Sequence, residues 1–496
     1  MKQSQRIVKN FFASGLSTGL GGFLQLVVIL VVARWLTVRE FGVFSFMLAF
    51  GFVVERLCDC GMSSILIRDL AVAPARIGEL LGAALALMIP IGLVLLLAMT
   101  GIIPLFRFNR HLSILIGLMG IARFEHVITG CYGAVLLSQE AYELHAIGFV
   151  MHKLGLLLMV SGALSLGTGL TGVVVAHLVS IVLPWALFRR MVAIRYGHAR
   201  LNFQLRLWKY LITQGAPVGA AAVVRLLGEQ SDVMILTAMA GTQAVGFFSG
   251  PYRIGTGLRY LPQALVVALF PMFSRSAAAI GSTAEFLTAY ERGLRLFILM
   301  AFPPAVVFLV APQTMTVSLL GARYLAATPA MRLMSPCVLL LFFASPFPLL
   351  LTALNQQRFL LGSSLIALIL RIGLVLALTP SMNFLAPCIA LIVAETVLVT
   401  MWIGGVRQAG LRPRLINMAW RPAIGAATMA ALLYWLAPHT AMGLIAASIA
   451  GSAVYLAVVL KLGALSEAEV SLIREGLNFV RPFLAEWSHP LHRKSP

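Results

Sequence analysis

Long apolar stretches separated by short polar breaks run along the whole chain. Most of these stretches hold about 20 residues or more, the length that an α-helix needs to cross the hydrocarbon core of a bilayer. A helix is favoured there because it satisfies all its backbone hydrogen bonds internally. The pattern therefore predicts an all-α polytopic membrane protein with about fourteen spans, near 11–33, 42–66, 78–101, 112–137, 145–167, 171–189, 210–237, 244–272, 293–311, 330–354, 359–378, 384–404, 419–437 and 441–460.

Composition agrees with this prediction. The 496 residues are 60% hydrophobic and 11% charged, with a mean hydropathy of +0.95. A soluble chain of this length usually divides into domains with charged surfaces. The first stretch follows Lys2, Arg6 and Lys9, but at about 23 residues it is too long for the apolar core of a signal peptide. We therefore expect it to be retained as the first helix.

The distribution of basic residues predicts the orientation. The chain has 37 Lys and Arg against 17 Asp and Glu, a net charge of +20. Most of the basic residues that lie between spans fall on the same side as the N-terminus, and they are densest in the segment 189–209. By the positive-inside rule, both termini are expected to be cytoplasmic. We interpret the basic segment as a linker that faces lipid headgroups, and expect no nucleic-acid partner.

A short repeat predicts two related lobes. The segment GVFS at 42–45 resembles GFFS at 246–249, and each opens the second helix of a half. Six intervening spans would give both halves the same orientation, as in some secondary transporters. The prediction has five parts: an N-lobe (1–192), a basic linker (193–209), a C-lobe (210–406), two further helices (407–461) and an amphipathic cytoplasmic tail (462–496).

Several catalytic classes lack their motifs. The sequence contains no G-x-x-x-x-G-K-S/T, no H-E-x-x-H and no C-x-x-C. The predicted outer loops are short, which disfavours a membrane glycosyltransferase or polymerase because such enzymes generally hold their catalytic carboxylates in a larger loop domain. We expect no enzyme activity, no cofactor and no metal.

Charged residues inside the spans are the main functional signal. Arg225, Glu229 and Asp232 lie at i, i+4 and i+7, so they share one face of a helix. Each charge at the centre of a span costs about 2.5–3.5 kcal/mol. The charges must therefore face a wet cavity or one another.

Eight basic and six acidic residues fall within the predicted spans, so pairing alone cannot neutralise the set. A cavity with excess positive charge would attract an anion, and arginine suits phosphate because it donates two parallel hydrogen bonds. The predicted substrate-binding cations are Arg56, Arg123, Lys153, Arg225, Arg253 and Arg259. The predicted ion-coupling acids are Glu55, Asp59, Glu229 and Asp232.

Structural alternatives exist for these charges. Arg225 and Glu229 could pair along one helix. Arg371 could pair with Glu395 on the next span, and Arg332 could extend to the membrane surface. Any of these would leave the residue without a role in transport.

Four segments resemble a known family, and two of them are LCDCGMSSILIRDLA at 57–71 and YLAATPAMRLMSPCVLLLF at 324–342. QSDVMILTAMAGTQAVGFFSGPYRI at 230–254 and LPQALVVALFPMFSR at 261–275 are similar to segments of the bacterial polysaccharide flippase family. This family belongs to the multidrug/oligosaccharidyl-lipid/polysaccharide exporter (MOP) superfamily. The resemblance implies fourteen helices in two lobes, a cationic central cavity and alternating access that moves a lipid-linked sugar. Asp232 matches the acid in the seventh span of the family.

The combined hypothesis is a flippase for undecaprenyl-pyrophosphate-linked oligosaccharide. Its partners would be this substrate, membrane lipids and a polysaccharide polymerase, and we expect a monomer. The rivals are a multidrug/cation antiporter of the same superfamily and a flippase for the lipid precursor of peptidoglycan. The sequence predicts that Arg225→Ala abolishes transport whereas Arg225→Lys retains part of it.

Overall fold

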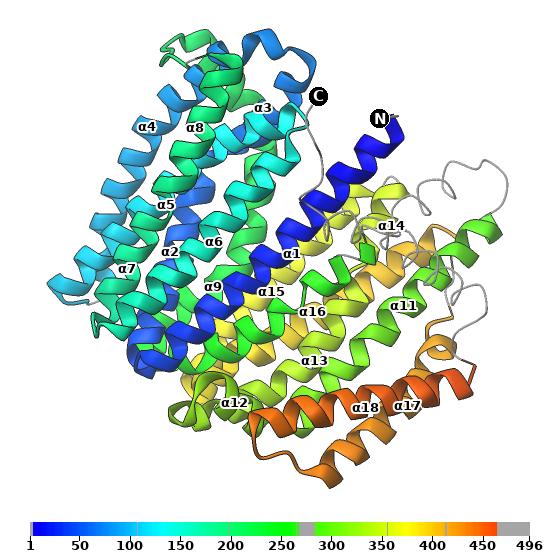
Figure 1. The fold of residues 1–496 in the computed structure, drawn as a ribbon. Coiled ribbons are helices and arrows are strands. Elements are labelled where there is room, and N and C mark those ends of the chain that lie inside the picture. Colours follow the sequence, from blue (N-terminus) through cyan, green and yellow to red (C-terminus); the bar gives the residue numbers. More distant parts are fainter. Residues whose placement is uncertain are drawn as a thin grey trace, which may run out of the picture. The chain divides into compact units, whose positions relative to one another are not determined.

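The computed structural model describes residues 3–106, 108–197, 199–263, 265–266, 283–354, 356–411 and 414–463. Within these ranges all regular structure is helical and no strand occurs, so the all-α prediction is confirmed (Figure 1). The predicted amphipathic helix of the C-terminal tail falls at 464–496, outside the described residues.

The first part of the chain forms a series of helices joined by short connections. They are α1 (Gln3–Trp35), α2 (Val38–Asp59), α3 (Met62–Val72), α4 (Ile77–Ile102), α5 (Arg110–Ser138), α6 (Tyr142–Ser165), α7 (Gly169–Ser180), α8 (Val182–Tyr196) and α9 (Leu205–Gly257).

The second part continues in the same way. Its helices are α11 (Thr283–Val310), α12 (Pro312–Leu320), α13 (Thr328–Ala344), α14 (Phe347–Ala353), α15 (Gln357–Met382), α16 (Ala386–Gln408), α17 (Leu415–Leu436) and α18 (Ala441–Lys461).

Helix starts follow local capping chemistry. Thr37 and Glu40 form a capping box at the start of α2: the Glu40 N–H donates to Thr37 Oγ1 (3.2 Å), and the Thr37 N–H donates to Glu40 Oε2 (2.9 Å). Asn109 accepts the Leu112 N–H at the start of α5 (2.8 Å). These caps satisfy backbone donors that a helix leaves open.

The predicted spans agree with the helices. Ten described stretches are long and apolar enough to cross a membrane, and two of them, Ala222–Gln263 and Gln357–Gln408, each contain or overlap two predicted spans. The shorter apolar stretch Gly19–Trp35 falls on the first predicted span, and α17 falls on the thirteenth. About fourteen spans is thus consistent with the structure.

The connection expected between the seventh and eighth spans is a break inside α9. The helix runs from Leu205 to Gly257, but Gly241 has φ 81° and ψ 175°, which are not helical values. A positive φ favours glycine because a Cβ would clash there. The predicted short loop is therefore reduced to one glycine, which separates two helical segments.

Packing divides the chain into two compact units. The first contains Met1–Tyr260, Thr316–Met331 and Leu365–Ala394, and the second contains Leu261–Met315, Arg332–Ser364 and Glu395–Pro496. Neither unit is one continuous stretch of sequence. The predicted lobes, 1–192 and 210–406, stay a prediction.

In the first unit, the two copies of the GVFS-like repeat pack against each other where α2 meets α9. A Cβ placed on Gly42 would lie 1.7 Å from the carbonyl oxygen of Thr242, and a Cβ on Gly246 would lie 2.1 Å from that of Val38. Gly42 thus faces the carbonyl of Thr242, four residues before Gly246, and Gly246 faces the carbonyl of Val38, four residues before Gly42. The contact is reciprocal, and glycine is required at both positions because no side chain fits between the backbones.

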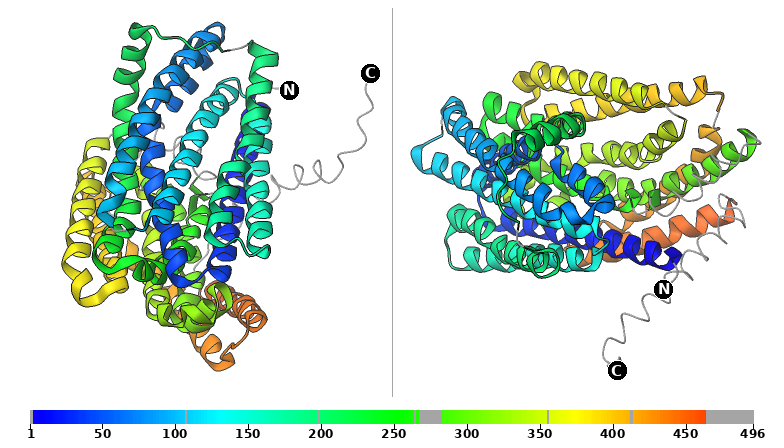
Figure 2. Two further views of the ribbon diagram at one scale, coloured as in Figure 1. Left: turned by 90° about the vertical axis from the view of Figure 1, so that its left-hand side faces the viewer. Right: turned by 90° about the horizontal axis from the view of Figure 1, so that it is seen from above.

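In the second unit, α17 and α18 form an antiparallel pair that packs on α11 (Figures 1 and 2). The Tyr455 hydroxyl donates to the carbonyl of Leu299 (2.9 Å), and the Thr314 hydroxyl donates to that of Pro438 (2.6 Å). The first hydrogen bond joins α18 to the middle of α11, and the second joins the connection between α17 and α18 to α12.

Candidate substrate site

Arg123 of α5 and Glu55 of α2 form a buried but loose ion pair. Arg123 Nη1 lies 3.5 Å from Glu55 Oε2, and only 12% and 10% of the two side chains are exposed. Glu55 Oε2 has no hydrogen-bond partner in the described part of the chain. The guanidinium lies over the ring of Phe52, 4.2 Å from its centroid. Gly51 leaves the space for this side chain, since a Cβ there would approach Arg123 Cγ to 2.7 Å.

Three further predicted cations belong to the same region. Lys153 of α6 donates to Gln25 Oε1 of α1 (2.9 Å) and interacts electrostatically with Arg123 and Glu55. Arg253 of α9 lies within electrostatic range of Arg123. Arg56 lies within electrostatic range of His126, and so do Arg123 and Lys153. We call Arg56, Arg123, Lys153, Arg253 and Glu55 the cationic cluster.

Three histidines, of which His152 and His177 are buried, border this cluster, and the sequence interpretation missed them. The rings of His126 and His152 are 5.6 Å apart, and His152 Nδ1 lies 3.3 Å from the Ser180 carbonyl. His177 Nδ1 lies 2.9 Å from the Val173 carbonyl, whereas its Nε2 has no hydrogen-bond partner among the described residues. The available signal was the occurrence of histidines inside apolar helices, where a polar ring needs a partner.

A second group of charges surrounds Asp232 of α9. Arg371 of α15 donates from Nε to both oxygens of Asp232 (3.2 and 3.1 Å) and from Nη2 to Oδ2. Asp232 is fully buried and Arg371 is 7% exposed. This is a forked arginine–carboxylate pair, which fixes both side chains.

A neighbouring pair completes this group. Arg259 Nη1 donates to Glu229 Oε1 (2.8 Å), and both side chains are about a third exposed, at 38% and 32%. Tyr252 lies between the pairs: its hydroxyl donates to the Glu229 carbonyl (3.4 Å), and the Arg371 guanidinium lies 6.0 Å from its ring centroid. We call Glu229, Asp232, Tyr252, Arg259 and Arg371 the balanced cluster, because it holds two carboxylates and two guanidinium groups.

These contacts identify partners that the sequence did not. Arg371 donates to Asp232 and not, as one alternative held, to Glu395. Glu229 accepts from Arg259 thirty residues away, and not from Arg225 on the same helix face. The spacing along one helix could not reveal either partner, because Arg371 lies on α15 and Arg259 lies in the turn after α9.

Two predicted site residues lie outside both clusters. Arg225 is exposed and makes no ion pair within the described ranges. Asp59 accepts the N–H groups of Gly61 (3.1 Å) and Ser63 (3.2 Å). Its carboxylate therefore stabilises the turn into α3. The transport roles predicted for both residues stay predictions.

The fold is shared with solved membrane transporters. A lipid II flippase, MurJ, in an inward closed conformation matches with a TM-score of 0.72 and 13% identity, over 89% of this chain and 97% of that one. An inward-facing multidrug resistance MATE family transporter of the MOP superfamily matches with a TM-score of 0.61 and 14% identity, over 79% and 94%.

A third match is a MOP superfamily transporter from Pyrococcus furiosus, described as having a binding pocket of reverse polarity. It has a TM-score of 0.53 and 14% identity, over 81% of this chain and 96% of that one. At these identities the likeness establishes the fold. The chain thus has the fold of a MOP superfamily membrane transporter.

The sequence comparison then identifies the family. Residues 7–277 match the family described as polysaccharide biosynthesis protein. The chain belongs to this family, which confirms the resemblance found in the sequence. No curated protein sequence gives a significant match.

Proposed function

We propose that this protein is a flippase for undecaprenyl-pyrophosphate-linked oligosaccharide, in which the cationic cluster receives the pyrophosphate. The observation that supports the proposal is the charge of that cluster, which holds four cations and one carboxylate, and Oε2 of this carboxylate has no hydrogen-bond partner among the described residues. Phosphate oxygens would accept hydrogen bonds from N–H groups of the cationic cluster that Glu55 does not bind. Membership of a polysaccharide biosynthesis family favours a sugar-bearing substrate.

The mechanism needs no covalent chemistry. A pyrophosphate resists entry into the bilayer because its charge must leave water. Arg123 and Arg253 would replace that water with forked hydrogen bonds, while Lys153 adds a point charge. The sugars would remain in the polar interior and the polyprenyl tail in lipid, and alternating access would then open the site to the other face.

Ion coupling is the second part of the proposal. The predicted coupling acids are Glu55, Asp59, Glu229 and Asp232, and Glu55 is the one that shares a region with the proposed phosphate site. If the Glu55 carboxylate alternately pairs with Arg123 and binds a proton or cation, substrate release would be linked to an ion gradient. Asp232 and Glu229 each already accept from an arginine, so their coupling role would require those pairs to open.

Two rivals make different use of the same fold. A multidrug/cation antiporter would need a site that attracts cations, whereas the cationic cluster repels them. A flippase for the peptidoglycan lipid precursor would use the same pyrophosphate chemistry, and the fold likeness to the lipid II flippase supports it as the second candidate. The two flippase proposals differ in the polar group that the pyrophosphate carries.

The proposed setting is the bacterial inner membrane, with both termini in the cytoplasm and the protein acting as a monomer. The proposed partners are membrane lipids, the lipid-linked oligosaccharide and a polysaccharide polymerase that consumes it. The distribution of basic residues between the predicted spans supports this orientation.

Cells that lack the gene test the proposed function. We expect completed lipid-linked repeat units to accumulate on the cytoplasmic leaflet while surface polysaccharide disappears. The wild-type gene should restore surface polysaccharide, whereas the Arg123→Gln gene should not. Unchanged surface polysaccharide together with increased drug sensitivity would support the antiporter. Arrest of peptidoglycan synthesis, with lipid precursor accumulating on the inner leaflet, would support the second flippase.

A further inference from the structure

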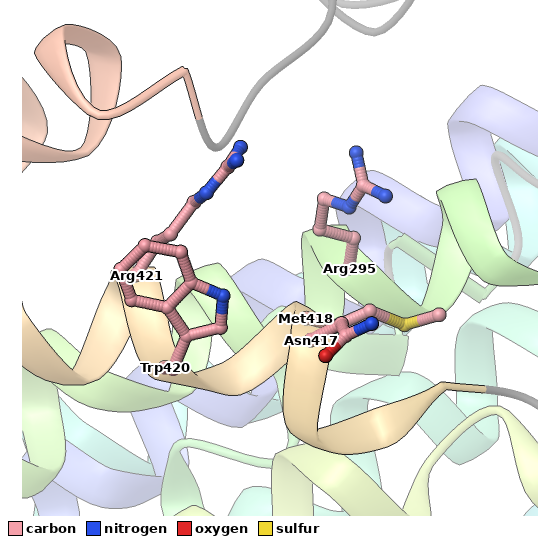
Figure 3. Close-up of a pocket in the computed structure, with 5 residues that line it drawn as sticks. All are labelled: Arg295, Asn417, Met418, Trp420 and Arg421. Atoms are coloured by element: carbon pink, nitrogen blue, oxygen red, sulfur yellow. The ribbon is translucent and has the colours of Figure 1, made fainter.

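A separate cationic pocket lies in the second unit, between α11 and α17. It has a volume of about 420 Å³ and is lined by Arg295, Asn417, Met418, Trp420 and Arg421 (Figure 3). None of these five residues is acidic. The pocket is therefore built for an anion or a strong hydrogen-bond acceptor.

The pocket lies where the ends of three apolar spans meet. Arg295 is near the start of the apolar stretch Gly293–Val310 of α11. Trp420 and Arg421 lie in the second turn of α17, and Arg421 Nη1 donates to the carbonyl of Gly463, just beyond the end of α18. Span ends that meet in this way mark one face of the membrane, so the pocket lies at the interface between lipid headgroups and hydrocarbon.

The side chains are arranged for a phosphate. The Arg421 guanidinium lies 5.2 Å from the Trp420 ring centroid, and its Nε is buried with no hydrogen-bond partner among the described residues. In Figure 3 the Arg295 and Arg421 side chains extend toward the same side of α11 and α17. Glu291, one turn before Arg295, accepts the backbone N–H of Arg414 (3.1 Å). Two guanidinium groups facing one pocket can bind a phosphate from two directions.

An apolar stripe continues from the pocket along α17. Ile416, Trp420 and Ile424 are spaced four residues apart and are 82%, 45% and 43% exposed. Residues with this spacing share one face of a helix. A ligand with its phosphate in the pocket could lay an acyl chain along this stripe, whereas a free phosphate would use only the pocket.

We propose that this pocket binds the phosphate of an anionic phospholipid. The lipid would connect α11 to the α17–α18 hairpin by bridging Arg295 and Arg421, with its acyl chain against Ile416 and Ile424. This site is separate from the cationic cluster, and it does not depend on the transported substrate.

Fluorescence quenching tests the proposal directly. Purified full-length protein in detergent is titrated with brominated phosphatidylglycerol, which quenches tryptophan fluorescence. The quenching that is seen in the wild type and lost in Trp420→Phe comes from Trp420 and therefore reports lipid bound at the pocket. Brominated phosphatidylcholine is the neutral control. We expect half-maximal quenching of Trp420 to need about tenfold more lipid in Arg295→Ala/Arg421→Ala, with an intermediate value in Arg421→Lys. Arg332→Ala, which removes an exposed arginine of α13 in the same unit, should behave as wild type.

The other outcomes overturn the proposal. Equal quenching of Trp420 by phosphatidylglycerol and phosphatidylcholine would mean that the phosphate charge of an anionic lipid is not recognised. Displacement of phosphatidylglycerol by millimolar inorganic phosphate would assign the pocket to a free anion. Wild-type quenching in Arg421→Lys and in the double variant would show that the arginines take no part. Folding is checked by size-exclusion elution, and if the double variant aggregates, Arg421→Lys decides.

Discussion

The two charge clusters of the first unit contain similar residues but use them differently. In the balanced cluster, Arg371 and Asp232 are joined by forked hydrogen bonds, and Arg259 and Glu229 by a bond of 2.8 Å. In the cationic cluster, Arg123 and Glu55 approach only to 3.5 Å, and the cluster contains four cations and one carboxylate. A paired arginine is committed to its carboxylate, whereas an arginine with a loose partner can exchange it for a ligand.

This difference separates structure from transport. Burying a complete ion pair costs desolvation that its own attraction largely repays, so such a pair fixes the positions of two helices. An excess of partly buried cations lacks this compensation within the cationic cluster itself and is stabilised by an anion. The balanced cluster should therefore affect stability most, and the cationic cluster should affect transport most.

The largest effect is expected from Asp232→Asn. This change leaves the Arg371 guanidinium buried without its anion, and breaking a buried pair in this way costs about 3–5 kcal/mol. We expect a lower free energy of unfolding, measured by thermal or denaturant unfolding of the purified protein in detergent.

Two controls accompany this prediction. Asp232→Asn/Arg371→Gln removes both charges and should recover most of the loss, because neither charge is then unpaired. Glu229→Gln breaks the pair with Arg259, which is about a third exposed, and should cost at most about 1 kcal/mol. Equal costs for Asp232→Asn and Glu229→Gln would contradict the assignment of Asp232–Arg371 as the structural pair.

The second prediction concerns Arg123→Gln. Hydrogen bonds to a charged group contribute about 1.5–3 kcal/mol, so binding of the pyrophosphate should weaken roughly 10- to 100-fold. Transport should fall by a similar factor in proteoliposomes, measured by access of an impermeant glycosidase to the lipid-linked sugar.

The control is Asp232→Asn/Arg371→Gln, which like Arg123→Gln removes an arginine of the first unit, but removes it from the balanced cluster together with its carboxylate. It should retain most of its transport once its folding is verified. If this variant loses transport as completely as Arg123→Gln, the division between the two clusters fails.

The third prediction concerns Glu55→Gln. Glu55 is the carboxylate that competes with phosphate for Arg123, so its neutralisation should tighten pyrophosphate binding by about two- to tenfold. Release would slow, and any dependence of transport on pH or on a cation gradient should weaken. Binding is measured by competition with inorganic pyrophosphate. Asp59→Asn is the control, because Asp59 accepts hydrogen bonds from the turn that leads into α3. Weaker binding in Glu55→Gln would contradict the competition.

The sequence predicted the helices and the candidate charges but not their partners. Apolar length and basic breaks are local properties, so the spans could be predicted from them. Pairing is not local: Arg371 is 139 residues from Asp232, and Arg259 is 30 residues from Glu229. The GVFS-like repeat was visible as similarity, whereas the backbone contact between Gly42 and Gly246 required coordinates. The histidines beside Arg123 were missed because a single polar ring in an apolar helix gives a weak pattern.

The smallest effect is expected at Arg225 if transport depends on the cationic cluster alone. From sequence, Arg225→Ala should abolish transport, because a charge at the centre of a span is costly unless it has a function. In the structure Arg225 is exposed and belongs to neither cluster. A contact in water contributes about 0.2–1 kcal/mol, so Arg225→Ala should reduce transport by roughly fivefold at most. Arg225→Lys should behave as wild type in the same glycosidase assay. Complete loss of transport in Arg225→Ala, with normal expression and folding, would show that the phosphate path extends beyond the cationic cluster.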